Sequence, residues 1–246
     1  MSHSTDHKTT PGPGATVFIA ASETDSNLYY ATKFIAPDPF IYLEVKGERL
    51  MIMSDLEVDR ARHQATVDRV VSYSELERRA KSQGIKDPGN IDVIHLVLQD
   101  AGVHDILVPP TFPFLHAQRL QELGYRLRTK RDPFYESRVV KTDEEVRHIE
   151  AAQRATEQAV AAAHESLRRA EIRDHVLWLD GAVLTSERVK KLINVALMEC
   201  ECVAQHTIVA GGEQACDPHD EGSGPLPAHR SIIFDVFPRS ADSRYF

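Results

Sequence analysis

The feature that most constrains the fold is a helix start in the middle of the chain. Thr142 followed by Glu145 forms a capping box, in which both side chains satisfy backbone amides that the first turn of a helix leaves unpaired. Side chains suited to one helix face then recur at spacings of three and four, at Val146, Ile149, Ala152, Thr156, Val160, Ala163 and Leu167. This pattern predicts a long amphipathic helix that opens a second structural unit, residues 141–246.

The chain before this helix alternates between strand and helix patterns. Apolar strands are predicted at 15–21 and 105–110, and a hairpin at 40–53 turns at Lys46-Gly47. Helices are predicted at 54–65, 72–84, 90–102 and 112–124, and residues 125–140 are predicted to leave the unit as a strand-rich segment. The alternation predicts an α/β domain over residues 15–140.

After the long helix the pattern is α+β. A second amphipathic helix is predicted over about 185–201, with Val189, Leu192, Ile193, Ala196 and Leu197 on one face. Two strands follow, HTIVAGG and SIIFDVF, separated by a loop rich in Gly, Pro, His and carboxylates.

Composition limits the binding partners and the cellular location that the sequence is compatible with. The 246 residues suffice for two domains, and 42% hydrophobic with 27% charged residues is ordinary globular composition. A net charge of −8 argues against nucleic-acid or anionic-membrane binding, and no run approaches the roughly 18 apolar residues of a membrane span. Residues 1–14 carry no apolar leader and are predicted to be a disordered tail, so a cytoplasmic protein with reduced thiols is expected.

Two residues of the last loop and strand are candidates for chemistry. Asp235 falls inside the apolar strand SIIFDVF, where an ionised carboxylate is costly unless a cation or several donors meet it. The alternative is that strand alternation turns Asp235 to solvent. His219 follows Pro218 in a glycine-containing loop that could hold an imidazole at the mouth of a cleft, although a loop histidine can also be simply exposed.

A competing hypothesis is a small zinc site. Soft ligands gather within twenty residues, at Cys200, Cys202, His206, Cys216 and His219. Their spacing is poor, because Cys200 and Cys202 point to different faces of a predicted helix and no CxxC pair is present. The sequence has no GxSxG, P-loop or GxGxxG motif to support a nucleophile elbow or a nucleotide site.

The segment TIVAGGEQACDPHDEGSGPLPAHRSIIFDVFPR resembles the catalytic domain of the pita-bread metallopeptidases, specifically Xaa-Pro aminopeptidases and prolidases. Upstream, DSNLYYATKF and PDPFIYLEVKGERLMIMSDLEVDRA resemble the creatinase-like N-terminal domain of such enzymes, and RVVKTDEEVRHIEAAQRAT resembles their junction helix. The resemblance implies an α/β creatinase-like N-terminal domain followed by a partial α+β pita-bread catalytic domain.

The resemblance also implies a site. Family members hold two divalent cations, manganese, cobalt or zinc, through two aspartates, a histidine and two glutamates. Asp235 matches the first aspartate, and His219 matches a catalytic histidine that contacts the substrate and stabilises the tetrahedral intermediate. The second aspartate is expected about a dozen residues after Asp235, in a motif like "GDMTRT" that the sequence does not reach, so one ligand of five is expected here.

The implied chemistry is hydrolysis of the Xaa-Pro bond of peptides with proline in second position, by a metal-bridging hydroxide. The complete enzyme is expected to be a homodimer, and this chain alone to be an inactive fragment that does not bind the metals. The alternative is a noncatalytic or metal-free pita-bread protein, either a binding module or a creatinase-like amidinohydrolase.

Overall fold

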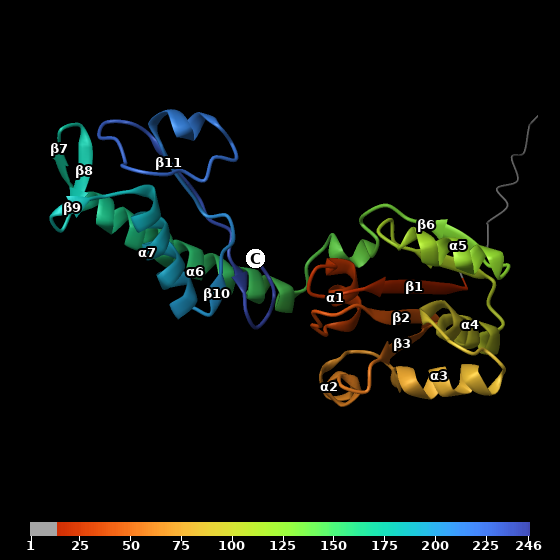
Figure 1. Ribbon diagram of the computed structural model, residues 1–246. Coiled ribbons are helices and arrows are strands. Elements are labelled where there is room, and N and C mark those ends of the chain that lie inside the picture. Colours follow the sequence, from red (N-terminus) through yellow and green to blue (C-terminus); the bar gives the residue numbers. More distant parts are fainter. Residues whose placement is uncertain (1–13) are drawn as a thin grey trace, which may run out of the picture. The chain divides into compact units, whose positions relative to one another are not determined.

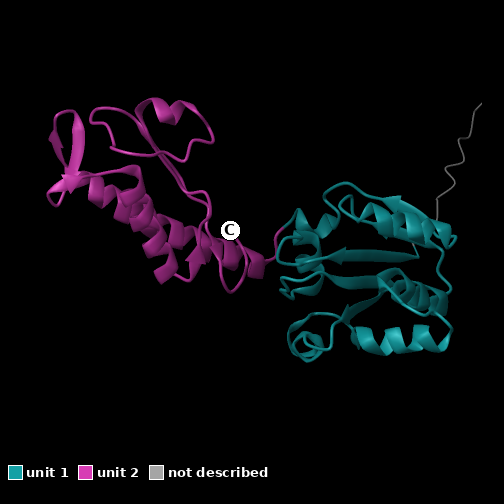
Figure 2. Cartoon of the chain, in the orientation of Figure 1, with its two compact units in different colours: residues 1–140 teal, residues 141–246 magenta. Residues whose placement is uncertain are grey.

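The structure is a computed structural model that describes residues 14–246, so the predicted tail lies outside the described residues except for Gly14. The chain forms two compact units, Met1–Val140 (unit 1) and Lys141–Phe246 (unit 2), which Figure 2 shows in separate colours. Each unit contains its own hydrophobic clusters.

Unit 1 is built on a six-stranded mixed sheet in the order β4-β3-β2-β1-β5-β6 (Figure 1). Its strands are β1 (Ala15–Ala20), β2 (Phe40–Val45), β3 (Glu48–Met53), β4 (Arg69–Ser72), β5 (Asp105–Val108) and β6 (Arg126–Thr129). The pairs β1/β2 and β2/β3 are antiparallel, whereas β3/β4, β1/β5 and β5/β6 are parallel. The predicted hairpin is confirmed: Lys46 and Gly47 connect β2 to β3 with φ of 53° and 87°, both positive as a type I′ turn requires.

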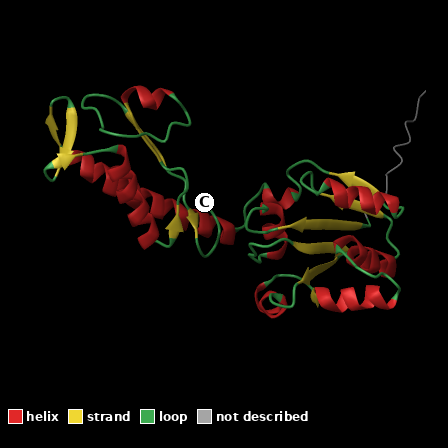
Figure 3. Ribbon diagram, viewed as in Figure 1, coloured by secondary structure: helices red, strands yellow, loops and turns green. Residues whose placement is uncertain are grey.

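Helices cover both faces of this sheet, and strand alternation sends different side chains to each face. The helices of unit 1 are α1 (Ser26–Thr32), α2 (Val58–Gln64), α3 (Tyr73–Ser82), α4 (Asn90–Ala101), α5 (Phe114–Glu122) and the 3₁₀ turn η1 (Glu136–Arg138). Val17 and Leu43 pack with α3, α4 and α5, whereas Phe18 and Tyr42 pack with α1 and α2. The sheet is therefore the middle layer of an α/β unit, as predicted (Figure 3).

The predicted strand-rich exit at 125–140 is wrong beyond β6. The chain leaves the sheet after Thr129, and Phe134 is buried against Phe18 with ring centroids 4.9 Å apart. Burying this aromatic ring on the face covered by α1 and α2 draws the segment over the sheet rather than along its edge.

Unit 2 is built around two long helices, α6 (Asp143–Arg168) and α7 (Ser186–Glu199). The predicted capping box of α6 is confirmed, since the Thr142 and Glu145 side chains each accept from the backbone amide of the other residue. Helix α7 also begins with a cap, because the Thr185 hydroxyl accepts from the Arg188 amide. Between the two helices lies a three-stranded antiparallel meander of β7 (Glu171–Arg173), β8 (Val176–Leu179) and β9 (Ala182–Val183). Two antiparallel pairs follow α7: β10 (Cys202–Val203) pairs with β13 (Arg239–Ser240), and β11 (Ile208–Gly211) pairs with β12 (Ile232–Asp235). The 3₁₀ helix η2 (Gly212–Cys216) directly follows β11.

The buried face of α6 differs from the predicted one. Ala152 and Ala163 are buried as predicted, but the rest of the buried stripe consists of Ala155, Ala159 and Ser166, which the prediction did not include, and Val146 is 40% exposed. Small side chains let α6 lie close to α7, whose Val189, Ile193 and Leu197 are fully buried in the same cluster. The predicted face of α7 is also too wide, because Leu192 is 41% exposed.

Within residues 14–246, no helix combines the length and hydropathy that crossing a bilayer would require.

Unit 1 produced alone, as residues 14–140, is expected to fold. Every member of its two hydrophobic clusters lies between Ala15 and Tyr135, so the unit buries its core without any side chain of unit 2. A cooperative thermal transition and dispersed amide NMR signals from this 14–140 polypeptide are the expected result. A spectrum with the narrow amide dispersion of an unfolded chain would show that its core needs unit 2.

Candidate functional site

A hollow of about 650 Å³ lies in unit 2 where β11 passes into η2. Its lining includes the glycines Gly211 and Gly212 and the polar residues Gln214, Cys216 and Arg230. Glu213, Ala215, Ser223, Pro225, Pro227, Ser231 and Ile233 complete the lining. Polar groups of both charges thus surround a concave surface, which is typical of binding sites in loops carried by strands.

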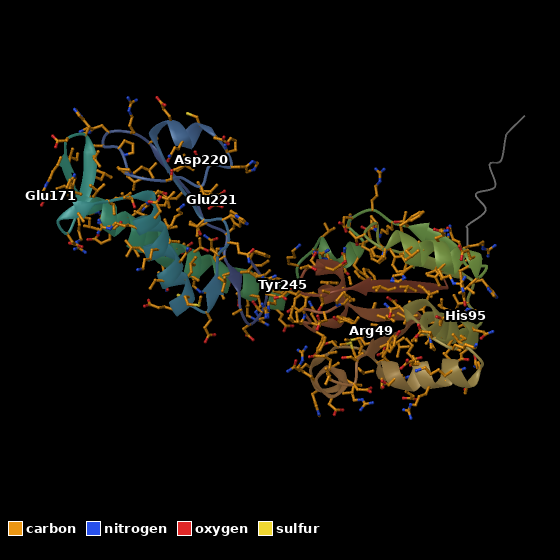
Figure 4. All side chains as sticks on the ribbon, viewed as in Figure 1. Arg49, His95, Glu171, Asp220, Glu221 and Tyr245 are labelled. Atoms are coloured by element: carbon orange, nitrogen blue, oxygen red, sulfur yellow. The ribbon has the colours of Figure 1, made fainter. Side chains whose placement is uncertain are left out.

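The loop of residues 217–224, which we call the histidine loop because it carries His219, follows η2 and contributes Ser223 to this lining. Figure 4 labels Asp220 and Glu221 within it. The first turn of α7 anchors this loop: the Gly224 amide donates to the Glu187 carboxylate at 3.0 Å, and the Ser186 amide donates to the Gly224 carbonyl at 2.9 Å. The hydrogen bond from the Gly224 amide, followed by one from the Thr185 hydroxyl, lowers the pKa of Glu187 below its ordinary value.

Lys190, one turn further along α7, extends this anchoring. Its Nζ donates to the carbonyl oxygens of Glu221 and Gly222, at 3.2 and 2.9 Å. An ammonium that bridges two consecutive carbonyls fixes the direction of the backbone between them. Helix α7 therefore holds the histidine loop at Glu221, Gly222 and Gly224.

Gly222 packs directly against the backbone of β11. It has a φ of +78°, and a Cβ placed on it would lie 1.9 Å from the carbonyl oxygen of Val209. The same strand residue receives the Ser186 hydroxyl at 2.6 Å on its carbonyl and donates its amide to the Glu221 carbonyl at 3.1 Å. Only glycine fits this position, because it combines positive φ with contact against backbone.

His219 is exposed at the outer part of the loop. Its backbone amide donates to Asp217 Oδ1 at 3.1 Å, and the Gly222 amide donates to Asp220 Oδ1 at 2.8 Å, so two aspartates order the turn around the imidazole. Gln214 of η2 also holds the loop, because its side-chain amide donates to the Ser223 carbonyl and its Oε1 accepts from the Ser223 backbone amide. The backbone around the imidazole is therefore fixed, and its ring is open to solvent.

Asp235 is exposed at the end of β12, opposite Ile208 in the antiparallel ladder. Alternation places Ile233 and Phe237 on the same face, and both are 46% exposed, whereas Phe234 packs inward and meets the His164 ring edge-on at 5.8 Å. Of the two sequence interpretations, the solvent-facing carboxylate describes the observed structure. Asp235 nevertheless sits two residues from Ile233, which lines the hollow.

The structure does not bring His219 and Asp235 into one lining, since neither is among the residues that line the hollow. In the described part of the chain, residues 14–246, no group of three or more His, Cys, Asp or Glu side chains is placed to hold a metal ion. A lone carboxylate cannot satisfy the six or so ligands of one hard cation, and two cations need more. The residues present thus do not fit the two-metal centre that the resemblance implies.

The environments of the three cysteines argue against the small zinc site considered from the sequence. Cys200 Sγ donates to Gln158 at 3.1 Å, Cys202 is buried in the α6/α7 cluster, and Cys216 lines the hollow, so the three thiols have separate environments. Burial raises the pKa of the Cys202 thiol, which disfavours the thiolate that zinc requires.

Sequence reasoning did not find the anchors of the histidine loop. Ser186, Glu187 and Lys190 contact residues 23 to 37 positions away in the sequence, and nothing in their local pattern indicates this. The one available signal was the pair Gly222 and Gly224, which marked a backbone of unusual conformation.

Gly222→Ala is expected to destabilise unit 2 far more than Gly224→Ala. Both glycines have positive φ, which costs an alanine about 1–2 kcal/mol, but nothing lies within 4 Å of a Cβ on Gly224. The added contact with Val209 brings the expected cost at Gly222 to about 2–5 kcal/mol. Denaturant unfolding of both variants measures the difference, and equal costs would contradict the close approach.

A scan against protein-family models gives no match to this sequence, and a search of curated proteins gives none either.

Solved structures, in contrast, share its fold. A prolidase from Pyrococcus furiosus matches with a TM-score of 0.66 and 16% identity over 91% of this chain and 61% of that chain. An X-Pro aminopeptidase from Thermotoga maritima MSB8 matches with a TM-score of 0.68 and 18% identity, covering 91% of this chain and 58% of that chain. A Xaa-Pro dipeptidase from Bacillus anthracis matches with a TM-score of 0.71 and 14% identity, covering 91% of this chain and 56% of that chain. The chain spans about three-fifths of the length of these structures.

The predicted fold is confirmed by these matches: the chain has the fold of prolidases and Xaa-Pro aminopeptidases, a creatinase-like α/β unit followed by part of a pita-bread unit.

Proposed function

We propose that this chain is the front part of a metal-dependent aminopeptidase or dipeptidase that hydrolyses Xaa-Pro bonds. The observation that carries the proposal is the shared fold across 91% of the chain with solved structures titled prolidase, X-Pro aminopeptidase and Xaa-Pro dipeptidase. The order of motifs supports it, because the histidine loop and the aspartate strand follow each other as the family resemblance requires.

Asp235 is proposed as a metal ligand and His219 as a catalytic residue. Asp235 presents its carboxylate at the end of β12, on the face that carries Ile233 into the hollow. His219 stands on a backbone ordered by Asp217 and Asp220, so its exposed imidazole is positioned to donate a hydrogen bond to a bound peptide. The other ligands are proposed to belong to a longer form of the protein.

The associated partners belong to the same proposal. They are two divalent ions, manganese, cobalt or zinc, in the complete enzyme, a peptide substrate with proline in second position, and a second copy in a homodimer. We propose a cytoplasmic enzyme without nucleic-acid or membrane partners, consistent with the net charge of −8.

The 246-residue polypeptide is expected to show no metal-dependent cleavage of Xaa-Pro peptides. Asp235 alone cannot fix two cations in the coordination that activates water. The measurement is release of the N-terminal amino acid from a set of Xaa-Pro dipeptides and longer Xaa-Pro peptides with manganese, cobalt or zinc added. Turnover that a chelator abolishes would contradict the assignment of this chain as a fragment without most of its ligands.

In a longer protein that contains the remaining ligands, Asp235→Ala and His219→Ala are expected to fail in different ways. Asp235→Ala removes a ligand, so metal content and activity fall together. His219→Ala keeps the metals and lowers kcat by about 10²- to 10³-fold, the usual effect of losing one donor to developing charge. Elemental analysis beside kcat distinguishes the two.

Matched controls are available in the same unit. Asp242 and His229 are exposed and lie outside the lining of the hollow. Asp242→Ala and His229→Asn, the latter chosen because Asn tolerates the φ of 58° at this position, are expected to change neither metal content nor kcat. If His219→Ala lost metal as Asp235→Ala does, the roles would be assigned wrongly. If both site variants kept metal and activity, the alternative of a noncatalytic or metal-free protein would be favoured.

A further inference from the structure

A cavity of about 400 Å³ lies in unit 1, at the end of the sheet where β3 and β4 finish. Its lining includes Met53, the last residue of β3, Tyr73 and Ser74 in the first turn of α3, and Asn90 at the start of α4 (Figure 1). We call it the strand-end pocket. Because β3 and β4 are parallel, their carboxyl ends meet here, and ligands of open α/β sheets bind outside the carboxyl ends of the strands.

The strands give the pocket an apolar part. Phe40 and Ile41 begin β2, Ile52 and Met53 end β3, and all four are buried. This part of the lining suits the aliphatic or aromatic portion of a small molecule, as in most ligand sites.

The charged part of the pocket is entirely acidic. Asp38, Asp55 and Glu57 contribute to the lining, and among the described residues that line it none is Lys, Arg or His. Glu57 is neutralised by Arg60, whose Nε donates to its carboxylate at 2.7 Å. Asp38 and Asp55 take part in no ion pair within the described range 14–246. Two negative charges therefore remain uncompensated beside an apolar surface.

Hydrogen bonds fix the walls of the pocket before any ligand binds. Asp55 accepts from the Ser72 hydroxyl at the start of α3, and the hydroxyls of Ser72 and then Ser74 lower the pKa of Asp55 below its ordinary value. Arg60 of α2 also donates to the Ile35 carbonyl at 2.9 Å, which ties the segment before β2 to α2. Ordered walls reduce the entropy that a ligand loses on binding.

We propose that the strand-end pocket binds a primary ammonium group carried on an apolar chain, with the ammonium paired to Asp38 and Asp55 and the chain against Ile52 and Met53. An ammonium has three donors and no acceptor, so it matches two carboxylates that have no cationic partner. The same chemistry is presented by a free alkylamine and by a lysine side chain of a polypeptide.

Other ligand classes fit the pocket less well. An anion would meet only negative charge in the lining. A divalent metal needs more ligands than two carboxylates, and nowhere in residues 14–246 are three or more His, Cys, Asp or Glu side chains placed together to supply them. The proposal does not depend on the proposed hydrolysis, because every lining residue belongs to unit 1.

The first experiment compares ligands with the same six-carbon chain by isothermal titration calorimetry on the full 246-residue protein. Hexylamine, which is protonated at neutral pH like a lysine side chain, should bind at least about tenfold more tightly than 1-hexanol, and hexanoate should not bind. Nα-acetyl-lysine amide distinguishes the sources: tighter binding than hexylamine supports a polypeptide lysine, and weaker binding supports a free amine.

The second experiment locates the ammonium with isosteric variants. Asp38→Asn and Asp55→Asn should each raise the dissociation constant for hexylamine by about tenfold and leave binding of 1-hexanol unchanged. The matched control is Asp59→Asn on α2, which removes the same charge from a side chain that is 83% exposed and outside the lining. It should change the dissociation constant by about twofold or less, because solvent and salt screen its charge. Circular dichroism verifies that each variant is folded.

Methyl NMR on the same protein locates the apolar chain. Hexylamine should shift the methyl signals of Ile52 and Met53 and leave those of Ile193, in the core of unit 2, unchanged.

Three results would each overturn the proposal. The first is equal affinity for hexylamine and 1-hexanol, or no binding of hexylamine at millimolar concentration. The second is an effect of Asp59→Asn as large as those of Asp38→Asn and Asp55→Asn, which would reduce the interaction to net charge. The third is a set of methyl shifts confined to unit 2. None of these results bears on cleavage of Xaa-Pro peptides, which is measured separately.

Discussion

The backbone of Val209 is the point on which the arrangement of unit 2 depends. Its carbonyl receives the buried Ser186 hydroxyl, its amide donates to the Glu221 carbonyl, and the Cα of Gly222 lies directly against the Val209 carbonyl. One strand residue thereby fixes the start of α7 and the histidine loop to β11. Buried polar groups of this kind are costly unless all are satisfied, so the three segments adopt their positions together rather than one at a time.

Elements with local signals could be predicted from the sequence. The capping box of Thr142 with Glu145 and the turn at Lys46-Gly47 each depend on contacts within a few residues, and the structure confirms both predictions. The face that α6 buries could not be predicted in the same way. Alanine carries little hydrophobic signal, yet Ala155 and Ala159 are buried and Val146 is not, because close packing against α7 selects small side chains.

In the candidate site, too, local sequence signals identified residues, whereas their orientation depended on tertiary packing. Asp235 could be singled out because a carboxylate within an apolar strand is locally anomalous, and His219 because its loop is rich in glycine and proline. Whether Asp235 turned inward or outward depended on which face of β12 packs against α6, and a single strand pattern does not contain that information. The lining by Arg230 and Cys216 likewise arises from tertiary structure, since β11 and β12 pair across a long connection.

Helix α7 has two roles in unit 2. Its first two turns, through Ser186, Glu187 and Lys190, hold the histidine loop, and its buried side fills the core of unit 2. The exposed apolar side chains Leu192, Val195 and Met198 lie on the later turns, where none of the loop anchors is found. Because Val189, Ile193 and Leu197 are fully buried, α7 is fixed in the core of unit 2, and the loop anchors on its first turns keep their position relative to that core.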